Sequence, residues 1–223
     1  MMNEMIPTQV VMLRSGKAPA LMSFPARPIE GGRLELAPPK RGVWYAEPKL
    51  NGWRAIVHTP TGAMWNRYGA RLSIAGCFQP ALKRLRVLAE RGLIWADCEA
   101  LQRRHHLGRG TLVVLDMMPE TGTPTYVERR TWLESFLALE PLYAGDLSSG
   151  VRVATDTVLL VPNLHAQSHE EALAFYGRLR ECNLTLGCEF FEGVVMKQAQ
   201  APYPLQLRNP SEGYRGWQKH RWA

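Results

Sequence analysis

The sequence predicts an α+β fold built on antiparallel sheets. Strand-like segments dominate the chain, and three helical segments interrupt them without the regular strand–helix alternation that a parallel sheet requires. With 223 residues, 46% of them hydrophobic and 21% charged, the chain has the size and composition of a folded domain with a substantial core. It contains no internal repeat and no low-complexity linker. A single domain is therefore the favoured organisation.

Alternation of apolar and polar residues and the positions of turns locate the strands. Residues 43–46 and 53–58 are strand-like, and a turn at 59–62 leads into 63–67, which predicts a hairpin. Further strands are expected at 93–101, 111–117, 151–161, 193–198 and 214–222.

The three helices are predicted from apolar spacing and end signals. In residues 80–91, Leu82, Leu85 and Leu88 recur at helical spacing and Gly92 ends the run. A second helix is expected at 127–139. A capping-box pattern that begins at Ser168 predicts a third helix ending near Cys182.

Before the first strand, residues 1–40 are rich in Pro, Gly and Met and show no lasting period, which predicts an irregular approach segment. Residues 41–223 are the expected folded domain. The sequence shows no signal peptide and no apolar run near the ~18 residues of a membrane span. We therefore expect a cytoplasmic monomer without membrane contact.

The chain carries a formal net charge of +7 and a sequence pI near 9.5, which favours an anionic partner such as a nucleic acid. Charge alone is equally compatible with a basic protein that binds no polyanion. The four cysteines form no Cys-x-x-Cys pair and have no histidine placed to complete a zinc site. Free thiols in a reducing compartment are the simpler interpretation.

Lys49 is the residue with the most chemical information. It precedes a glycine turn at Gly52, and Arg54 follows five residues later. A lysine in this setting can attack phosphorus, but Lys-x-x-Gly alone is common. Its significance depends on the acidic and basic segments that follow.

Four later segments supply what nucleotidyl transfer to a lysine requires. The lysine must lose its proton, carboxylates must hold a divalent metal near the phosphates, and cations must neutralise charge on the departing pyrophosphate. The segments are residues 66–69, 97–99, 192–197 and 217–221.

Together with residues 49–54, these segments resemble, in order, the motifs of the covalent nucleotidyltransferases, which include ATP-dependent DNA ligases, RNA ligases and mRNA capping enzymes. The match covers residues 43 to the C-terminus. Glu-Gly-Val-Val-Met-Lys at 192–197 is nearly verbatim, and Trp-Gln-Lys-His-Arg at 217–221 carries arginine at its second basic position. The resemblance implies a ligase-type nucleotidyltransferase domain: two antiparallel sheets flanked by helices, with a nucleotide cleft between them and no OB-fold domain.

The resemblance also implies a role for each site residue. Lys49 would form lysyl-AMP, Glu47 would help to read adenine, and Glu99 would bind the ribose hydroxyls. Glu192, together with Glu99, would hold the metal. The remaining nucleotide contacts would come from Arg54, Leu115, Lys197, Lys219 and Arg221. Arg67 and Arg54 would contact the phosphates of the nucleic acid.

Three departures from the family pattern bear on activity. Asn51 stands where DNA ligases usually have aspartate, so a negative charge is missing beside the lysine. Leu115 replaces the aromatic residue that usually stacks on adenine. The sequence ends just after Arg221, where the family usually continues into an OB-fold. The domain would then be naturally minimal, receive the OB-fold function from a protein partner, or react slowly in its first step.

The sequence thus predicts an ATP-dependent DNA ligase core that uses ATP and Mg²⁺ or Mn²⁺ to seal nicked or broken double-stranded nucleic acid, with DNA favoured over RNA. The alternatives are an RNA ligase, a guanylyltransferase-like enzyme, or a nick-binding module with weakened catalysis. A basic loop at residues 103–109 is as consistent with phosphate contacts as with a solvated loop.

Overall fold

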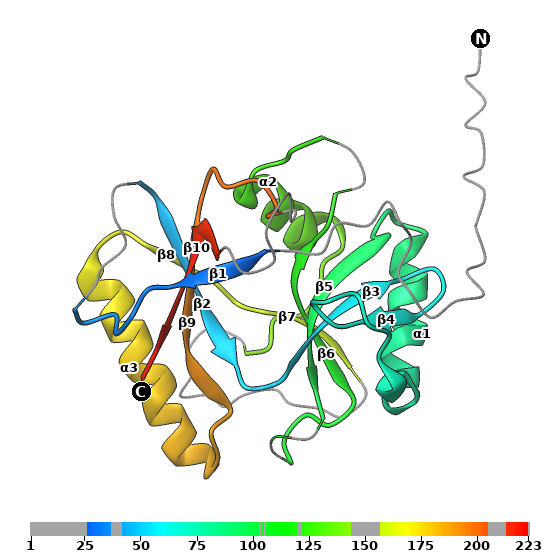
Figure 1. Ribbon diagram of the computed structural model, residues 1–223, viewed down its shortest axis with the longest axis horizontal. Coiled ribbons are helices and arrows are strands. Elements are labelled where there is room, and N and C mark those ends of the chain that lie inside the picture. Colours follow the sequence, from blue (N-terminus) through cyan, green and yellow to red (C-terminus); the bar gives the residue numbers. More distant parts are fainter. Residues whose placement is uncertain are drawn as a thin grey trace.

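The computed structural model describes residues 26–36, 42–102, 104, 106–119, 122–143, 157–204 and 213–222. Two five-stranded sheets stand side by side, and helices cover their outer faces (Figure 1). Most strand pairs are antiparallel. This arrangement confirms the predicted α+β fold.

The first sheet has the strand order β1-β10-β9-β2-β8. Its strands are β1 (Arg27–Glu30), β10 (Gly213–Arg221), β9 (Phe191–Gln198), β2 (Trp44–Leu50) and β8 (Leu164–Ala166). β1 runs parallel to β10, and the other neighbours are antiparallel. Helix α3 (His169–Leu186) packs on this sheet, where its residues Phe175 and Leu179 share a core with Ala46 and Met196.

The second sheet has the strand order β4-β3-β5-β6-β7. Its strands are β4 (Ala63–Trp65), β3 (Trp53–His58), β5 (Trp95–Leu101), β6 (Thr111–Met117) and β7 (Val158–Leu160). Helix α1 (Gln79–Ala89), which follows a 3₁₀ turn at Ser73–Phe78, buries Leu82 and Leu85 against this sheet. α1 and α3 thus lie on opposite outer sides of the molecule (Figure 1).

Helix α2 (Tyr126–Thr131) begins with a complete capping box between Thr125 and Glu128 and continues into a π-helical turn, Trp132–Phe136. At the start of α3, the Ser168 hydroxyl accepts from the Glu171 N–H at 3.2 Å. The Glu171 carboxylate accepts from Gln167 N at 2.8 Å, one residue outside the predicted box.

Several elements differ from the sequence prediction. Residues 27–30, expected to be irregular, form β1, and the described part of the strand expected at 151–161 is only Val158–Leu160. α3 runs to Leu186 because Gly187, with φ of 64°, terminates it there rather than near Cys182. β8 was not expected. Most of the predicted approach segment, 1–25 and 37–40, lies outside the described residues.

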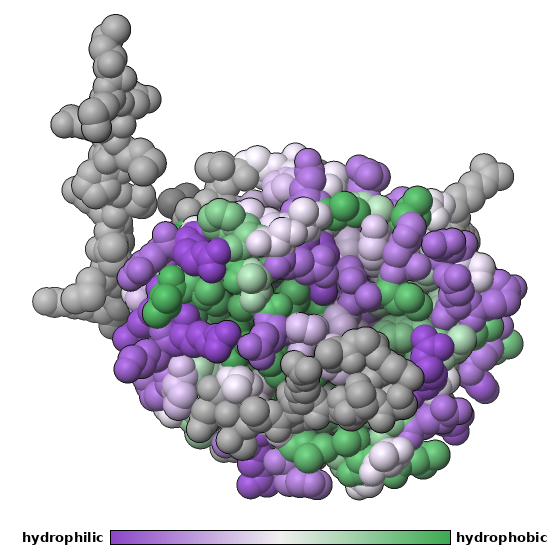
Figure 2. Space-filling view, turned by 180° about the vertical axis from the view of Figure 1, so that it is seen from behind, coloured by the Kyte–Doolittle hydropathy of each residue, from purple (hydrophilic) through white to green (hydrophobic). Residues whose placement is uncertain are grey.

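Within the described residues, no helix is long and apolar enough to cross a membrane, and no separate OB-fold is present. The four cysteines are free thiols, with Cys98 and Cys182 buried. On the face opposite that of Figure 1, hydrophilic and hydrophobic residues are interspersed (Figure 2).

Candidate functional site

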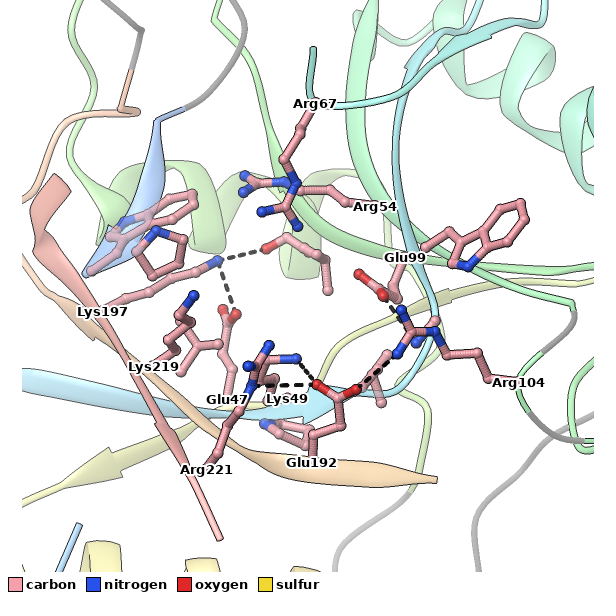
Figure 3. A pocket seen from close by; sticks show the side chains of 18 of the residues that line it. Glu47, Lys49, Arg54, Arg67, Glu99, Arg104, Glu192, Lys197, Lys219 and Arg221 are labelled. Atoms are coloured by element: carbon pink, nitrogen blue, oxygen red, sulfur yellow. Dashed lines mark hydrogen bonds and ion pairs between the residues drawn. The ribbon is translucent and has the colours of Figure 1, made fainter. Parts of the chain in front are cut away.

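A cavity of about 290 Å³ lies between the two sheets. Every site residue predicted from the sequence lines it (Figure 3): Glu47, Lys49, Arg54, Arg67, Glu99, Leu115, Glu192, Lys197, Lys219 and Arg221. These side chains come from β2, β9 and β10 of the first sheet and from β3, β5, β6 and the loop after β4 of the second. The fold therefore gathers into one place residues that are up to 174 positions apart.

The turn after Lys49 is the point where the chain passes from the first sheet to the second. Leu50 ends β2 and Trp53 begins β3, so only two residues connect the sheets. Gly52 is needed here, because a Cβ would lie 2.7 Å from Glu99 Cγ and 2.9 Å from the Ala100 carbonyl oxygen. The Gly52 N–H donates to Glu99 Oε1 at 3.0 Å. The turn thus holds Lys49 and Glu99 next to the same cavity.

Gly193 brings the acidic and basic strands together. It pairs with Lys49 on β2 and with Arg221 on β10, and its φ is 141°. A Cβ at this position would lie 1.9 Å from the His220 carbonyl oxygen, so only glycine permits this approach. As a result, Glu192 stands between Lys49 and Arg221.

We call Lys49, Arg104, Glu192, Lys219 and Arg221 the outer cluster. The Lys49 ammonium donates to Glu192 Oε2, and Arg221 Nε lies 3.6 Å from the same oxygen. Arg104 Nη1 approaches the other carboxylate oxygen at 3.3 Å. Lys219 Nζ lies 2.5 Å from Glu30 Oε1, on β1. One carboxylate thus faces three cations, which leaves this part of the cavity positively charged.

We call Glu47, Asp116, Tyr126, Arg129 and Lys197 the inner cluster. Lys197 Nζ contacts Glu47 Oε2 at 2.8 Å, the Leu115 carbonyl oxygen at 2.9 Å and Asp116 Oδ2 at 3.6 Å. The Tyr126 hydroxyl donates to Glu47 Oε1 at 2.7 Å. Burial raises the pKa of Glu47, although Lys197 and Arg130 oppose the rise. The four ion-paired side chains of the inner cluster are each at most 3% exposed: Glu47, Asp116, Arg129 and Lys197.

Glu99 lies on the second-sheet side of the cavity. Burial raises its pKa to about 7, against the opposing charges of Lys49 and Arg54 and with a contribution from Asp97 and Glu192. Near neutral pH the Glu99 carboxyl group is therefore partly protonated and partly ionised. A cation placed beside it would favour the ionised form.

Two arginines of the second sheet differ in their surroundings. Arg54 makes a bidentate pair with Asp97, with Nε–Oδ1 at 2.8 Å and Nη2–Oδ2 at 2.5 Å, and Tyr203 donates to the same carboxylate. That pair occupies one edge of the guanidinium group. Arg67, by contrast, has no hydrogen bond or ion pair to any described residue. Burial and the neighbouring Arg54 and Arg27 lower the pKa of Arg67.

Sequence reasoning assigned no contact to Asn51 and left Arg104 undecided; Arg104 lines the cavity, and Asn51 contacts Arg104. The Asn51 amide donates to the Glu189 carbonyl oxygen at 2.9 Å, and its Oδ1 accepts from Arg104 Nη1 at 3.0 Å. An aspartate at position 51 would have no proton for Glu189. The asparagine thus fits its surroundings in a way that an aspartate would not.

The carboxylates of the cavity fit a metal ion that arrives with phosphate groups. Within the described part of the chain, no group of three or more His, Cys, Asp or Glu side chains is placed to hold a metal. Glu99 and Glu192 both line the cavity. Mg²⁺ is commonly held by one or two carboxylates together with substrate phosphates and water, so two carboxylates meet that requirement.

Comparison with known proteins gives matches at the level of structure. No protein-family model matches the sequence, and no curated protein matches it. The ligase domain of LigD from M. tuberculosis is 19% identical with a TM-score of 0.52, over 89% of this chain and 59% of that one. Chlorella virus DNA ligase-adenylate is 16% identical with a TM-score of 0.53, over 88% and 69%. A structure named Pmar-Lig_Pre is 14% identical with a TM-score of 0.56, over 90% and 47%.

These matches show that the chain has the fold of DNA ligase nucleotidyltransferase domains and confirm the predicted fold. The chain spans 47% of the length of Pmar-Lig_Pre and 59% of that of the LigD ligase domain.

Proposed function

We propose that this chain is the core of an ATP-dependent DNA ligase that forms lysyl-AMP on Lys49. The observation that carries the proposal is the outer cluster: an amine in contact with a carboxylate, at the positive end of a cavity between the sheets. The fold similarity to DNA ligases supports the same reading.

The inner cluster offers a hydrogen-bonding pair for the base of the nucleotide. Glu47 offers a hydrogen-bond acceptor directly beside the Lys197 ammonium, a donor. Adenine (N6 donor, N1 acceptor) and guanine (N1–H donor, O6 acceptor) can both complement such a pair, so the choice of ATP rests on the sequence resemblance to ATP-dependent ligases and is tested below by comparing ATP with GTP. Leu115, which also lines the cavity, provides an apolar surface for the ring.

The first step joins Lys49 Nζ to the α-phosphorus of ATP and breaks the bond from that phosphorus to the pyrophosphate oxygen. Lys49 must give up a proton, and Glu192 is in place to accept it. Lys219 and Arg221 would neutralise the phosphate oxygens as pyrophosphate departs. A divalent cation held by Glu99 and Glu192 would screen the negative charge of the triphosphate.

In the two later steps AMP passes to a 5′-phosphate, where Arg67 would bind the phosphate, and the 3′-hydroxyl then displaces AMP to join the strands. Arg67 suits this role because it lines the cavity and has no protein partner among the described residues. Arg54, fixed by Asp97, offers only its remaining edge to the phosphate or the ribose.

The first test is adenylylation of the protein. Incubation with ATP labelled at the α-phosphate and Mg²⁺ should give an acid-labile covalent label on the wild-type protein and none on Lys49→Ala. A matched control is Lys83→Ala, an exposed lysine of α1 that lines no part of the cavity and should leave the label unchanged. An unlabelled wild type, or equal labelling of Lys49→Ala, would refute the proposal.

A second test identifies the acceptor. The adenylylated protein is offered nicked DNA and nicked RNA duplexes in parallel, and ATP is compared with GTP in the labelling step. Sealing of nicked DNA with ATP is the expected result. Preferential sealing of RNA would select the RNA ligase, and labelling by GTP would select the guanylyltransferase-like enzyme. Nick binding with neither label nor sealing would select the nick-binding module with weakened catalysis.

A further inference from the structure

Behind Glu47, a chain of two hydrogen bonds leads away from the cavity. The Tyr126 hydroxyl donates to Glu47 Oε1 at 2.7 Å, and the Asn163 amide nitrogen donates to the Tyr126 hydroxyl oxygen at 3.1 Å. Tyr126 is 1% exposed and Asn163 is half-buried. Among the described residues, those that line the cavity include Glu47 but neither Tyr126 nor Asn163. These two residues would therefore act on a bound nucleotide through Glu47.

Three separate parts of the fold supply this chain. Glu47 comes from β2 of the first sheet, and Tyr126 is the first residue of α2. Asn163 comes from the connection between β7 of the second sheet and β8 of the first. α2 is tied to the same connection by Arg130, whose Nη1 donates to the Val161 carbonyl oxygen at 2.5 Å. The donor and its support are thus fixed relative to each other.

The direction of the hydrogen bonds determines what Glu47 can offer to a ligand. Burial and the charge of Glu47 raise the pKa of Tyr126, so the hydroxyl keeps its single proton. Because the Asn163 amide nitrogen can only donate, it occupies the Tyr126 oxygen and leaves that proton for Glu47. Lys197 donates to the other oxygen of Glu47. Each carboxylate oxygen has a second lone pair, so Glu47 is held as an acceptor with capacity left for a ligand.

The ring of Tyr126 makes contacts that do not depend on its hydroxyl. Lys197 Nζ lies 5.2 Å from the ring centre, and the centre of the Tyr45 ring lies 5.4 Å away. A phenylalanine at position 126 would keep both contacts and lose only the hydrogen bonds. This makes it possible to test the hydroxyl separately from the packing.

We propose that Tyr126 and Asn163 are positioning residues for base recognition, which orient Glu47 as the hydrogen-bond acceptor for an amino group of the purine. In ATP this is the 6-amino group. The inference rests on the proposed function for its choice of a nucleotide as the ligand. It adds supports from α2 and from the β7–β8 connection, for which the sequence predicted no role.

The test compares binding of ATP with binding of purine riboside triphosphate, which differs from ATP only in lacking the 6-amino group. Binding is measured by calorimetry in EDTA, which removes the divalent metal that the proposed transfer requires. The wild type should bind ATP about 10-fold more tightly, as expected for one hydrogen bond to a charged group. Tyr126→Phe should weaken ATP binding about 5-fold and change binding of purine riboside triphosphate less than about 2-fold.

Tyr176→Phe is the matched control. Tyr176, on α3, is 4% exposed, and its hydroxyl has no hydrogen-bond partner among the described residues, so its loss should leave the wild-type preference for ATP unchanged. Equal weakening of both nucleotides by Tyr126→Phe would make Tyr126 a merely structural residue and overturn the proposal. A full preference in Tyr126→Phe, or no preference in the wild type, would overturn it as well.

Asn163→Asp tests the direction of the chain and is the second variant if Tyr126→Phe does not fold. It replaces the donor to the Tyr126 oxygen by an acceptor, so the hydroxyl proton can point away from Glu47. The preference for ATP should fall toward that of Tyr126→Phe, and a full wild-type preference would overturn the proposal. The binding measurement involves no covalent step, so it decides on Tyr126 and Asn163 even if the lysyl-AMP test refutes the proposed function.

Discussion

The inner and outer clusters of the cavity contain the same kinds of groups under very different conditions. In the inner cluster, Lys197 and Glu47 are 2% and 3% exposed and every charge has a partner at close range. In the outer cluster, Arg104 and Arg221 are 51% and 50% exposed, and both approach Glu192 at 3.3 Å or more. The charges of the inner cluster are shielded from water, whereas the two arginines of the outer cluster are open to it.

This difference matches the demands of the proposed reaction. Recognition of a base requires donors and acceptors that hold their places, which the buried pairs provide. Phosphate transfer requires charged groups that exchange partners as ATP, metal and DNA arrive and leave. The exposed pairs around Glu192 can do this at low cost, because ion pairs in contact with water contribute little stability.

Loss of a buried cation should have the largest effect on stability. Lys197→Met should lower the free energy of unfolding by about 3–5 kcal/mol, because it leaves the buried Glu47 carboxylate without its cation. Urea denaturation at neutral pH measures this. The loss should be smaller in acid, because Glu47, whose pKa burial already raises, then takes up a proton instead.

The matched control comes from the outer cluster. Lys219→Met removes a lysine of similar length, paired with a Glu30 side chain that is 65% exposed. Its effect on unfolding should stay within about 1 kcal/mol. Similar losses for the two variants would contradict the distinction between the clusters.

Glu99, on the second-sheet side of the cavity, should give a smaller, pH-dependent effect. Its pKa of about 7 in the folded protein exceeds the ordinary 4.5, so the folded state binds this proton more tightly than the unfolded chain does. Wild-type stability should therefore lose this contribution as pH rises from about 4.5 to 7. Glu99→Gln removes the ionisation, and at pH 8 it should raise the free energy of unfolding by about 1–2 kcal/mol.

Thermal unfolding of Glu99→Gln and wild type between pH 5 and 8 measures the difference. It should grow with pH up to about 7 and then stay level. Glu90→Gln, at an exposed position after α1, controls for the loss of one negative charge. A difference that is constant with pH would argue against a raised pKa for Glu99.

The sequence predicted the outer cluster better than the inner one, for a physical reason. Groups to which the sequence assigns chemistry, such as Lys49 and Glu192, occur in short motifs, so their types and spacing are visible along the chain. The supports of the inner cluster are not: Tyr126 reaches Glu47 across 79 positions, and Lys197 reaches the Leu115 carbonyl across 82. Only the folded chain shows that these contacts exist.

Short edge strands were missed for a related reason. β1 and β8 have four and three residues, too few to show a period, and β1 contains Pro28, which is tolerated at a sheet edge. Their positions depend on tertiary approach, as at Gly213 beside Ile29. The domain boundary near residue 41 and the roles of the individual site residues stay predictions.

The smallest expected effect concerns Asn51, whose amide ties the turn after Lys49 to Glu189. Asn51→Asp would gain charge attraction to the exposed Arg104 but lose the proton donated to the Glu189 carbonyl, and would place a carboxylate against that oxygen. Because an unmade hydrogen bond costs more than an exposed ion pair contributes, the free energy of unfolding should fall by about 1 kcal/mol. Urea denaturation at neutral pH measures it, and Asn51→Ala, which loses both contacts, is the control. An Asn51→Asp protein more stable than the wild type would mean that the contact with Arg104, and hence the outer cluster, is stronger than its exposure indicates.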